Sequence, residues 1–128
     1  MEVDPIHLFD LASSQARWLS VRQATVAQNV ANASTPGYSA LDVTPFADVY
    51  DQYQTTMVAT NPAHFGGDAM DISSISGKAG DVWEITHSGN SVSIEQEMLK
   101  ANEVNRGYSL NTAIVKAFNQ MMSASLKG

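Results

Sequence analysis

NVANASTPGY, at residues 29–38, is the stretch that decides how this chain folds. It stands where a long helical pattern stops: Pro36 disfavours helical backbone at Thr35, and Gly37 leaves the chain free to turn. No nucleophile, metal ligand or phosphate-binding loop lies beside it, so it points to structure and assembly. We single out six of its residues as a candidate turn site: Asn29, Asn32, Thr35, Pro36, Gly37 and Tyr38.

Residues 5 to about 33 carry the pattern of one long helix. Asp4 can cap its N-terminus, and Pro5 suits the first helical position because its missing N–H would have no partner there. Apolar residues recur at alternating spacings of three and four, with Gln23 as the break, which is typical of a coiled-coil seam. This seam consists of Phe9, Ala12, Ala16, Leu19, Val26, Val30 and Ala33.

Residues 37–92 differ in character and are expected to form an irregular, β-containing arm. They hold several turn signals and seven acidic residues against Lys78 alone, so the net charge of −6 resides in this segment. Residues 82–86 alternate weakly, which predicts a strand that pairs with residues 91–94 across a turn at Gly89. We expect residues 46–58 to form a short helix.

Residues 94 to about 126 carry the pattern of a second long helix. Ser93 and Gln96 form a capping-box pattern at its start. Gly107 stands out inside it, because glycine costs a helix about 1 kcal/mol relative to alanine. The positions expected to form the seam of this helix include Met98, Tyr108, Val115, Phe118 and Met122.

The second half of this helix is apolar on two sides. From Leu110 to Leu126 the only charged residue is Lys116. A helix that is apolar nearly all round must be buried on nearly all sides. Because two helices of a 13.8 kDa chain cannot cover such a surface, we expect other subunits to do so. The second apolar line consists of Leu110, Ile114, Ala117 and Met121.

Composition and motifs argue against an enzyme, a metal protein and a nucleic-acid-binding protein. The acidic balance lacks the basic footprint of nucleic-acid binding. Cysteine is absent, and His7, His64 and His87 are scattered without ligand spacing, so we expect no cofactor. No apolar run reaches the roughly 18–20 residues needed to span a bilayer. The acidic N-terminus is unlike a cleaved secretory signal, so any export is expected to proceed without one.

The opening stretch resembles the N-terminal signature of the bacterial flagellar axial proteins, which form the rod, the hook and the hook-associated parts. In that family a long helix ends in A-x-N-x-A-N-x-x-T-P-G-Y. The sequences NPAH at residues 61–64 and GNSVSIEQEM at residues 89–98 are similar to the flagellar basal-body rod family, in particular to its proximal rod members. The chain matches the signature at Ala27, Asn29, Ala31, Asn32, Thr35, Pro36, Gly37 and Tyr38.

The resemblance implies a mainly α fold. Residues 1–36 and 93–128 would pair as a coiled-coil-like hairpin, and residues 37–92 would form the arm. It implies a structural subunit that polymerises with copies of itself and other rod proteins into a helical tube, which transmits torque and conducts export substrates. It further implies contacts with the flagellar type III export apparatus and with a membrane ring or adaptor at the rod base, and a location in the periplasmic rod of the basal body.

The residues alone leave another interpretation open. Two amphipathic helices joined by a loop could form an ordinary antiparallel hairpin, as in a soluble adaptor or a secretion chaperone. The two-sided apolar helix fits an isolated hairpin poorly. The carboxamides Asn105 and Asn119 also favour assembly, because polar residues near a seam fix register and partner choice.

Overall fold

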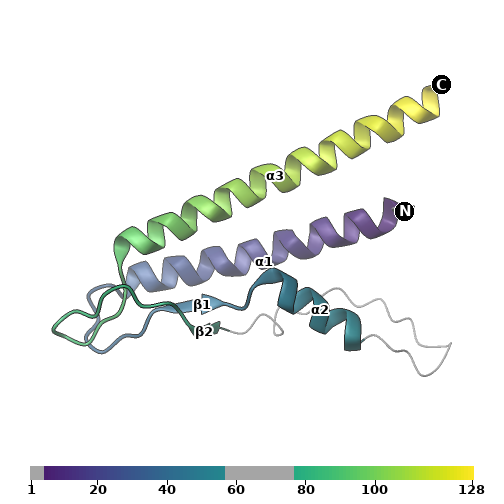
Figure 1. Ribbon diagram of the computed structural model, residues 1–128. Helices are drawn as coiled ribbons and strands as arrows, with labels where there is room; N and C mark the ends of the chain where they lie inside the picture. The colour runs from purple at the N-terminus through teal and green to yellow at the C-terminus, as the bar shows by residue number, and fades with distance from the viewer. Residues whose placement is uncertain (1–4, 57–76) are drawn as a thin grey trace.

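The computed structural model describes residues 5–56 and 77–128, and it is mainly helical. Two long antiparallel helices, α1 (Pro5–Ala31) and α3 (Ile94–Lys127), lie side by side (Figure 1). Between them in sequence come β1 (Leu41–Val43), α2 (Phe46–Thr56) and β2 (Gly77–Ala79). This architecture confirms the fold class expected from the sequence: long terminal helices with a largely irregular middle.

The two long helices begin where the sequence predicts. Helix α1 starts at Pro5, while its expected cap, Asp4, lies outside the described residues. Ser93 caps α3, and its side chain accepts a hydrogen bond from the Gln96 backbone N–H at 3.4 Å. Only half of the capping box forms: the Gln96 Oε1 accepts no hydrogen bond from the described residues, while the Gln96 Nε2 donates to the Asp81 carbonyl at 2.7 Å. The start of α3 is thereby tied to the arm.

The contact between α1 and α3 combines apolar packing with bonds to the backbone. The rings of Phe9 and Phe118 meet edge to face at 5.4 Å. One turn or more further along, Asn111 donates to the Ala12 carbonyl at 3.0 Å. Tyr108 then donates from its hydroxyl to the Ala16 carbonyl at 3.3 Å. Such side-chain donors fix the register of the two helices, because each must meet one particular carbonyl.

Gly107 is explained by this contact. A Cβ atom at Gly107 would lie 2.8 Å from Cδ2 of Leu19, a side chain that is only 3% exposed. The absence of a side chain at residue 107 therefore lets α1 and α3 approach closely at Leu19. The intrinsic helix cost of about 1 kcal/mol for glycine is offset by the burial of a leucine, which contributes roughly 1.5–3 kcal/mol.

The predicted seam residues divide into two groups. Phe9, Leu19, Val26, Tyr108, Val115 and Phe118 are buried or half-buried. Val30, Met98 and Met122 are 45%, 62% and 40% exposed, so the single chain leaves them largely uncovered. At the end of α1, Asn29 is the buried position in place of its neighbour Val30, because its carboxamide bonds the arm. Whether neighbours cover the three exposed residues stays a prediction.

The strand predicted at residues 82–86 is wrong. That segment has no strand, and Val82, Trp83 and Ile85 are 48%, 62% and 65% exposed. Its alternating pattern finds no layer to pack on, and its expected partner is used elsewhere, since residue 94 already belongs to α3. The two-stranded sheet joins β1 to β2 instead, in antiparallel register with Leu41 opposite Ala79.

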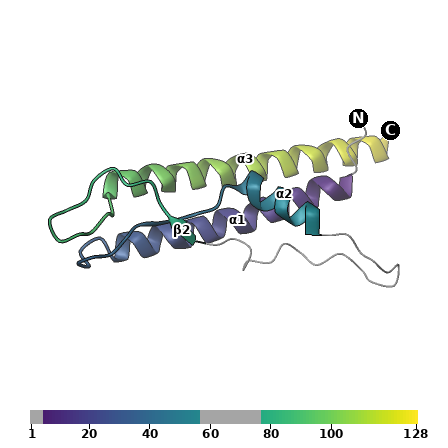
Figure 2. The ribbon, with the colours of Figure 1, turned by 60° about the horizontal axis from the view of Figure 1, so that its bottom comes forward.

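Helix α2 forms as predicted from its start, and residues 57 and 58 of the expected span lie outside the described residues. Figure 1 shows it on the side of α1 that is away from α3, and in Figure 2, with the bottom turned forward, it lies in front of the long helices. A small apolar core holds this side together. Val43 and Val49 are 4% and 1% exposed there, with Trp18, Val21 and Phe46 packed against them.

Candidate functional site

The candidate site is a junction, formed by residues 29–41 and 86–93, at which the helical hairpin meets the arm. Asn29 is its centre and is fully buried, at 0% exposure. Its side-chain N–H group donates to the Leu41 carbonyl at 2.7 Å, and its carbonyl oxygen accepts the Leu41 N–H at 3.0 Å. The same oxygen accepts the Tyr38 hydroxyl at 3.3 Å. Asn29 therefore pins the chain that leaves the turn back onto α1.

The turn itself is built from local bonds. Asn32 donates through its side chain to the Gln28 carbonyl at 2.8 Å, and it accepts the Thr35 hydroxyl at 3.1 Å. Pro36 is exposed. Gly37 has φ = 73°, a left-handed conformation that glycine adopts without strain, and a Cβ atom there would meet nothing within 4 Å. Backbone conformation rather than lack of space thus accounts for glycine at residue 37.

Asn90 closes the junction from the other side, and it was not predicted as a site residue. Its carboxamide is 2% exposed and donates to the carbonyls of Asn32 and Thr35 at 2.8 Å and 2.7 Å. These carbonyls follow the end of α1 and also accept the backbone N–H groups of Thr35 and Tyr38, so Asn90 gives each carbonyl of the turn a second hydrogen bond. Its own carbonyl oxygen accepts the Val92 N–H at 2.8 Å. The segment that enters α3 is therefore bonded to the turn that leaves α1.

Ser91 and Gly89 complete this closure. The Ser91 N–H donates to the Tyr38 carbonyl at 3.0 Å, and the Ser91 hydroxyl accepts the Ala40 N–H at 2.8 Å. Gly89 has φ = 81°, and a Cβ atom there would lie 3.6 Å from the Cα of Gly37. The two glycine turns thus lie against each other. The carboxamide of Asn90 and the hydroxyl of Ser91, directly after Gly89, were the sequence signal that could have indicated these site residues. Their partners lie about fifty residues earlier in the chain, so the sequence alone did not connect them.

A chain of charges lies beside the junction and links three elements. Asp42 of β1 accepts ion pairs from Arg22 of α1 at 3.5 Å and from Lys100 of α3 at 3.4 Å. Lys100 also pairs with Glu97 at 3.2 Å, and Arg22 pairs with Glu103 at 2.8 Å. Glu97 is fully buried, and its second carboxylate oxygen has no hydrogen-bond partner in the described part of the chain. A buried pair of this kind contributes mainly to a unique arrangement, and removal of one partner is costly.

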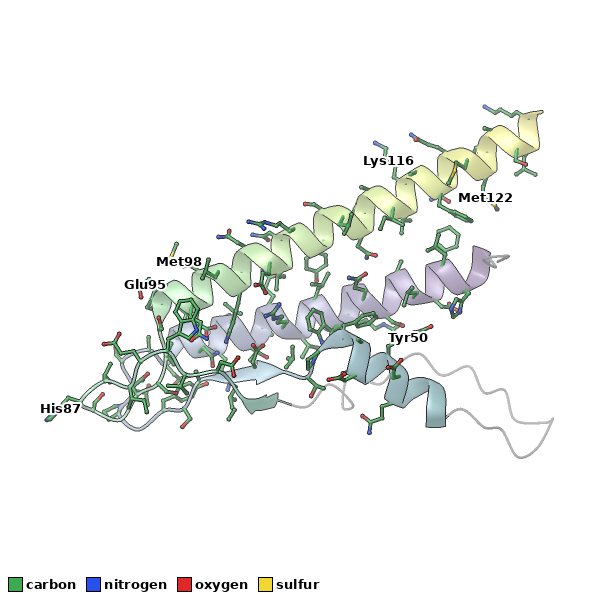
Figure 3. The ribbon with its side chains drawn as sticks, viewed as in Figure 1. Tyr50, His87, Glu95, Met98, Lys116 and Met122 are labelled. Atoms are coloured by element: carbon green, nitrogen blue, oxygen red, sulfur yellow. The ribbon has the colours of Figure 1, made fainter. Side chains whose placement is uncertain are left out.

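The bonds of the junction hold two parts of the chain in place. Within residues 5–56 and 77–128 no group of three His, Cys, Asp or Glu side chains could hold a metal ion. His7 hydrogen-bonds with the Tyr50 hydroxyl at 3.3 Å, whereas His87 lies at the tip of the loop before α3 (Figure 3). The helices of these residues include none long and apolar enough to cross a membrane. What the junction can do is fix the direction of the arm relative to the hairpin.

Away from the junction, the second apolar line predicted for α3 is open to solvent. We call it the outer line. Leu110, Ile114 and Met121 are 61%, 42% and 63% exposed, and Ala117 is also exposed. The helix ends beyond this line at Lys127, after Leu126, which is 85% exposed. An exposed apolar line of this length marks an interaction surface.

Comparison with known proteins agrees with a role in assembly. A protein family described as "Flagella basal body rod protein" matches residues 12–38, which cover most of α1 and its turn. The flagellar basal body rod protein FlgB of Agrobacterium fabrum is 44% identical over 129 residues, which include 98% of this chain and 96% of that protein. The similarity thus spans the hairpin, the junction and the arm together. The chain belongs to the FlgB family of flagellar basal body rod proteins.

Proposed function

We propose that this structural rod subunit polymerises into a helical tube whose wall is made of α1–α3 hairpins. The observation that carries the proposal is the outer line of α3, which remains exposed although α3 already packs on α1 through another face. A helix with two apolar faces needs a second covering layer. Contacts between different faces of successive copies generate a helical array, which is the geometry of a rod.

The three segments of the chain receive separate roles in this proposal. Residues 1–36 and 93–128 supply the helical layer, and residues 37–92 supply an arm that contacts neighbouring subunits. The turn at the junction directs the chain out of the helical layer and into the arm. Its residues are Asn29, Asn32, Thr35, Pro36, Gly37 and Tyr38. Torque would pass between the arm and the hairpin through the junction. Buried hydrogen bonds hold the junction rigid, which suits it to transmit that torque.

The family and the composition support a proposal for the remaining partners. We propose that the chain is exported unfolded through the flagellar type III apparatus without a cleaved signal, and that it assembles in the periplasmic, proximal part of the rod. Other rod proteins and a membrane ring or adaptor at the rod base would be its neighbours. The tube would conduct later export substrates and transmit torque. A subunit that lacks part of its own core is readily kept unfolded for export.

A deletion strain tests the function directly. Cells without this gene should lack rods and hooks in electron micrographs of isolated basal bodies, and they should not swim. Expression of the gene in trans should restore both. Basal bodies with complete rods in the deletion strain would contradict the proposal. A stable soluble dimer that stays outside the basal-body fraction would instead support the adaptor or chaperone interpretation, which the relative does not favour.

A further inference from the structure

The two halves of α3 are buried in different ways. We call residues 94–104 its near half and residues 105–127 its far half. Every buried residue of α3 lies in the near half, and three of the four carry polar or charged side chains: Gln96, Glu97 and Lys100, against Val104. A coiled-coil seam would bury apolar residues there instead. The near half is therefore held by polar contacts, each of which needs a particular partner.

The arm supplies these partners. The Gln96 side chain donates to the Asp81 carbonyl at 2.7 Å. The Lys100 ammonium group pairs with Asp42 of β1 at 3.4 Å and with Glu97 at 3.2 Å. Among the described residues, the fully buried Glu97 forms its ion pair with Lys100. Each buried polar residue of the near half thus reaches the arm, either directly or through Lys100.

Asp42 holds both long helices at once. Its Oδ1 pairs with the Arg22 Nε of α1 at 3.5 Å, and its Oδ2 pairs with the Lys100 Nζ of α3 at 3.4 Å. Without this carboxylate, two positive charges on neighbouring helices would lie beside each other in partly buried positions, where salt screens their repulsion only weakly. The direct pair from Arg22 to Glu103 is a weak substitute, because the Glu103 side chain is 59% exposed. Figures 1 and 2 show the strand pair beside α1, at the end of the hairpin where α3 begins.

We propose that the β1–β2 pair of the arm keeps the near half of α3 closed on α1, with Asp42 as the residue that couples them. Displacement of the arm frees the near half, and opening of the near half loosens the arm, because coupling between two sites is reciprocal. The far half bonds α1 directly through Tyr108 and Asn111, so it does not depend on the arm. The coupling is a property of the single chain; in the proposed rod it would carry a load on the arm to the hairpin.

Amide hydrogen exchange of the purified full-length chain, resolved by NMR, tests the coupling. Asp42→Asn removes the charge but keeps the shape and an oxygen that can accept the Val43 N–H. We expect the amides of residues 97–104 to exchange at least about tenfold faster, since buried charges lose a partner. The Gly80 amide, which donates to the Ala40 carbonyl at 3.0 Å, should report the arm and accelerate in parallel. The amides of residues 111–115 should keep their rates.

Three further variants separate coupling from a local effect. Lys100→Gln changes α3 alone, and it should speed exchange of the Gly80 amide in the arm. Asp42→Glu keeps the charge and should restore nearly native rates in both regions. The matched control, Asp51→Asn, removes an exposed carboxylate of the arm that takes part in none of the ion pairs of the described residues, and it should change neither region.

The unaltered chain provides a second measurement, which does not require any variant to fold. In urea concentrations below the unfolding transition, the Gly80 amide and the amides of residues 97–104 should open as one unit, with the same free energy and the same dependence on urea. Opening of the arm at lower urea, with residues 97–104 still protected, would overturn the coupling. So would an Asp42→Asn chain in which only the arm exchanges faster. Either result would leave the rod function, which the deletion strain tests, intact.

Discussion

The junction and the far half of α3 use their side chains in opposite ways. At the junction, Asn29, Asn90 and Ser91 are buried polar groups, and each satisfies backbone atoms of another segment. Along the far half of α3, Leu110 and Met121 are apolar and more than half exposed. The first region has its bonds within one chain, whereas the second leaves apolar side chains exposed. Substitutions should therefore affect the monomer at the junction and the assembly at the far half.

Loss of Lys100 should have the largest effect on the monomer. Lys100→Ala removes the ion-pair partner of the buried Glu97 and one of the two partners of Asp42. An uncompensated buried charge typically costs about 3–5 kcal/mol. Urea denaturation followed by circular dichroism should show a correspondingly lower midpoint. The double variant Lys100→Ala with Glu97→Gln should recover part of the loss, and equal stability of the single and double variants would argue against the charge network.

Asn29→Ala should have the second-largest effect on the stability of the monomer. It leaves the Leu41 N–H and carbonyl without their side-chain partners in a buried site, which costs about 2–3 kcal/mol. The matched control is Asn32→Ala, whose side-chain bonds are exposed and whose loss should cost about 0.5 kcal/mol. The same denaturation measurement checks both. Equal effects of the two variants would contradict the central place of Asn29.

The turn should be less sensitive in stability than in function. Pro36→Ala with Gly37→Ala places alanine at a φ of 73°, which costs about 1–2 kcal/mol, and it removes the block to helix continuation. We expect α1 to extend and the arm to be misdirected, so cells should make the protein and lose motility. Swimming on soft agar with immunoblot detection of the protein tests this. Normal swimming would show that the turn does not determine the direction in which the arm leaves the hairpin.

The outer line should give the smallest effect on the monomer. Ile114→Ser changes an exposed position, so the free energy of unfolding of the monomer should shift by about 0.5 kcal/mol or less. Swimming should nevertheless be impaired, because the neighbour that covers the line loses its apolar contact. The control Thr112→Ser changes an exposed polar position and should leave both properties unchanged. A variant at residue 114 that swims normally would place this line outside the assembly.

Local sequence signals predicted the helices and their ends well. Pro5, Ser93 and the Pro36–Gly37 pair act on the backbone within one or two turns, so their effects are visible without the fold. The two apolar faces of α3 could also be predicted from the sequence, because the residues of each face recur at helical spacing. The exposure of the outer line in the structure agrees with that pattern.

Features that depend on distant partners were not predictable. Asn90 bonds carbonyls 55 and 58 residues away, and β1 pairs with β2 through three residues on each strand. The alternation at residues 82–86 predicted a strand that is absent, since alternation cannot show whether a layer exists to pack on. Gly107 appeared unfavourable for a helix until Leu19 was found against it. Each of these features is decided by tertiary contact, which a single segment does not encode.

Amide hydrogen exchange, resolved along the chain, tests the central claim most directly. In the monomer we expect strong protection from about residue 97 to about residue 108, where α3 is bonded to the junction and to α1, and weak protection from about residue 117 to residue 127. In assembled rods the second region should become protected as well, because neighbours cover the outer line. Uniform, strong protection of α3 in the monomer, unchanged on assembly, would contradict the claim that neighbouring subunits complete this chain.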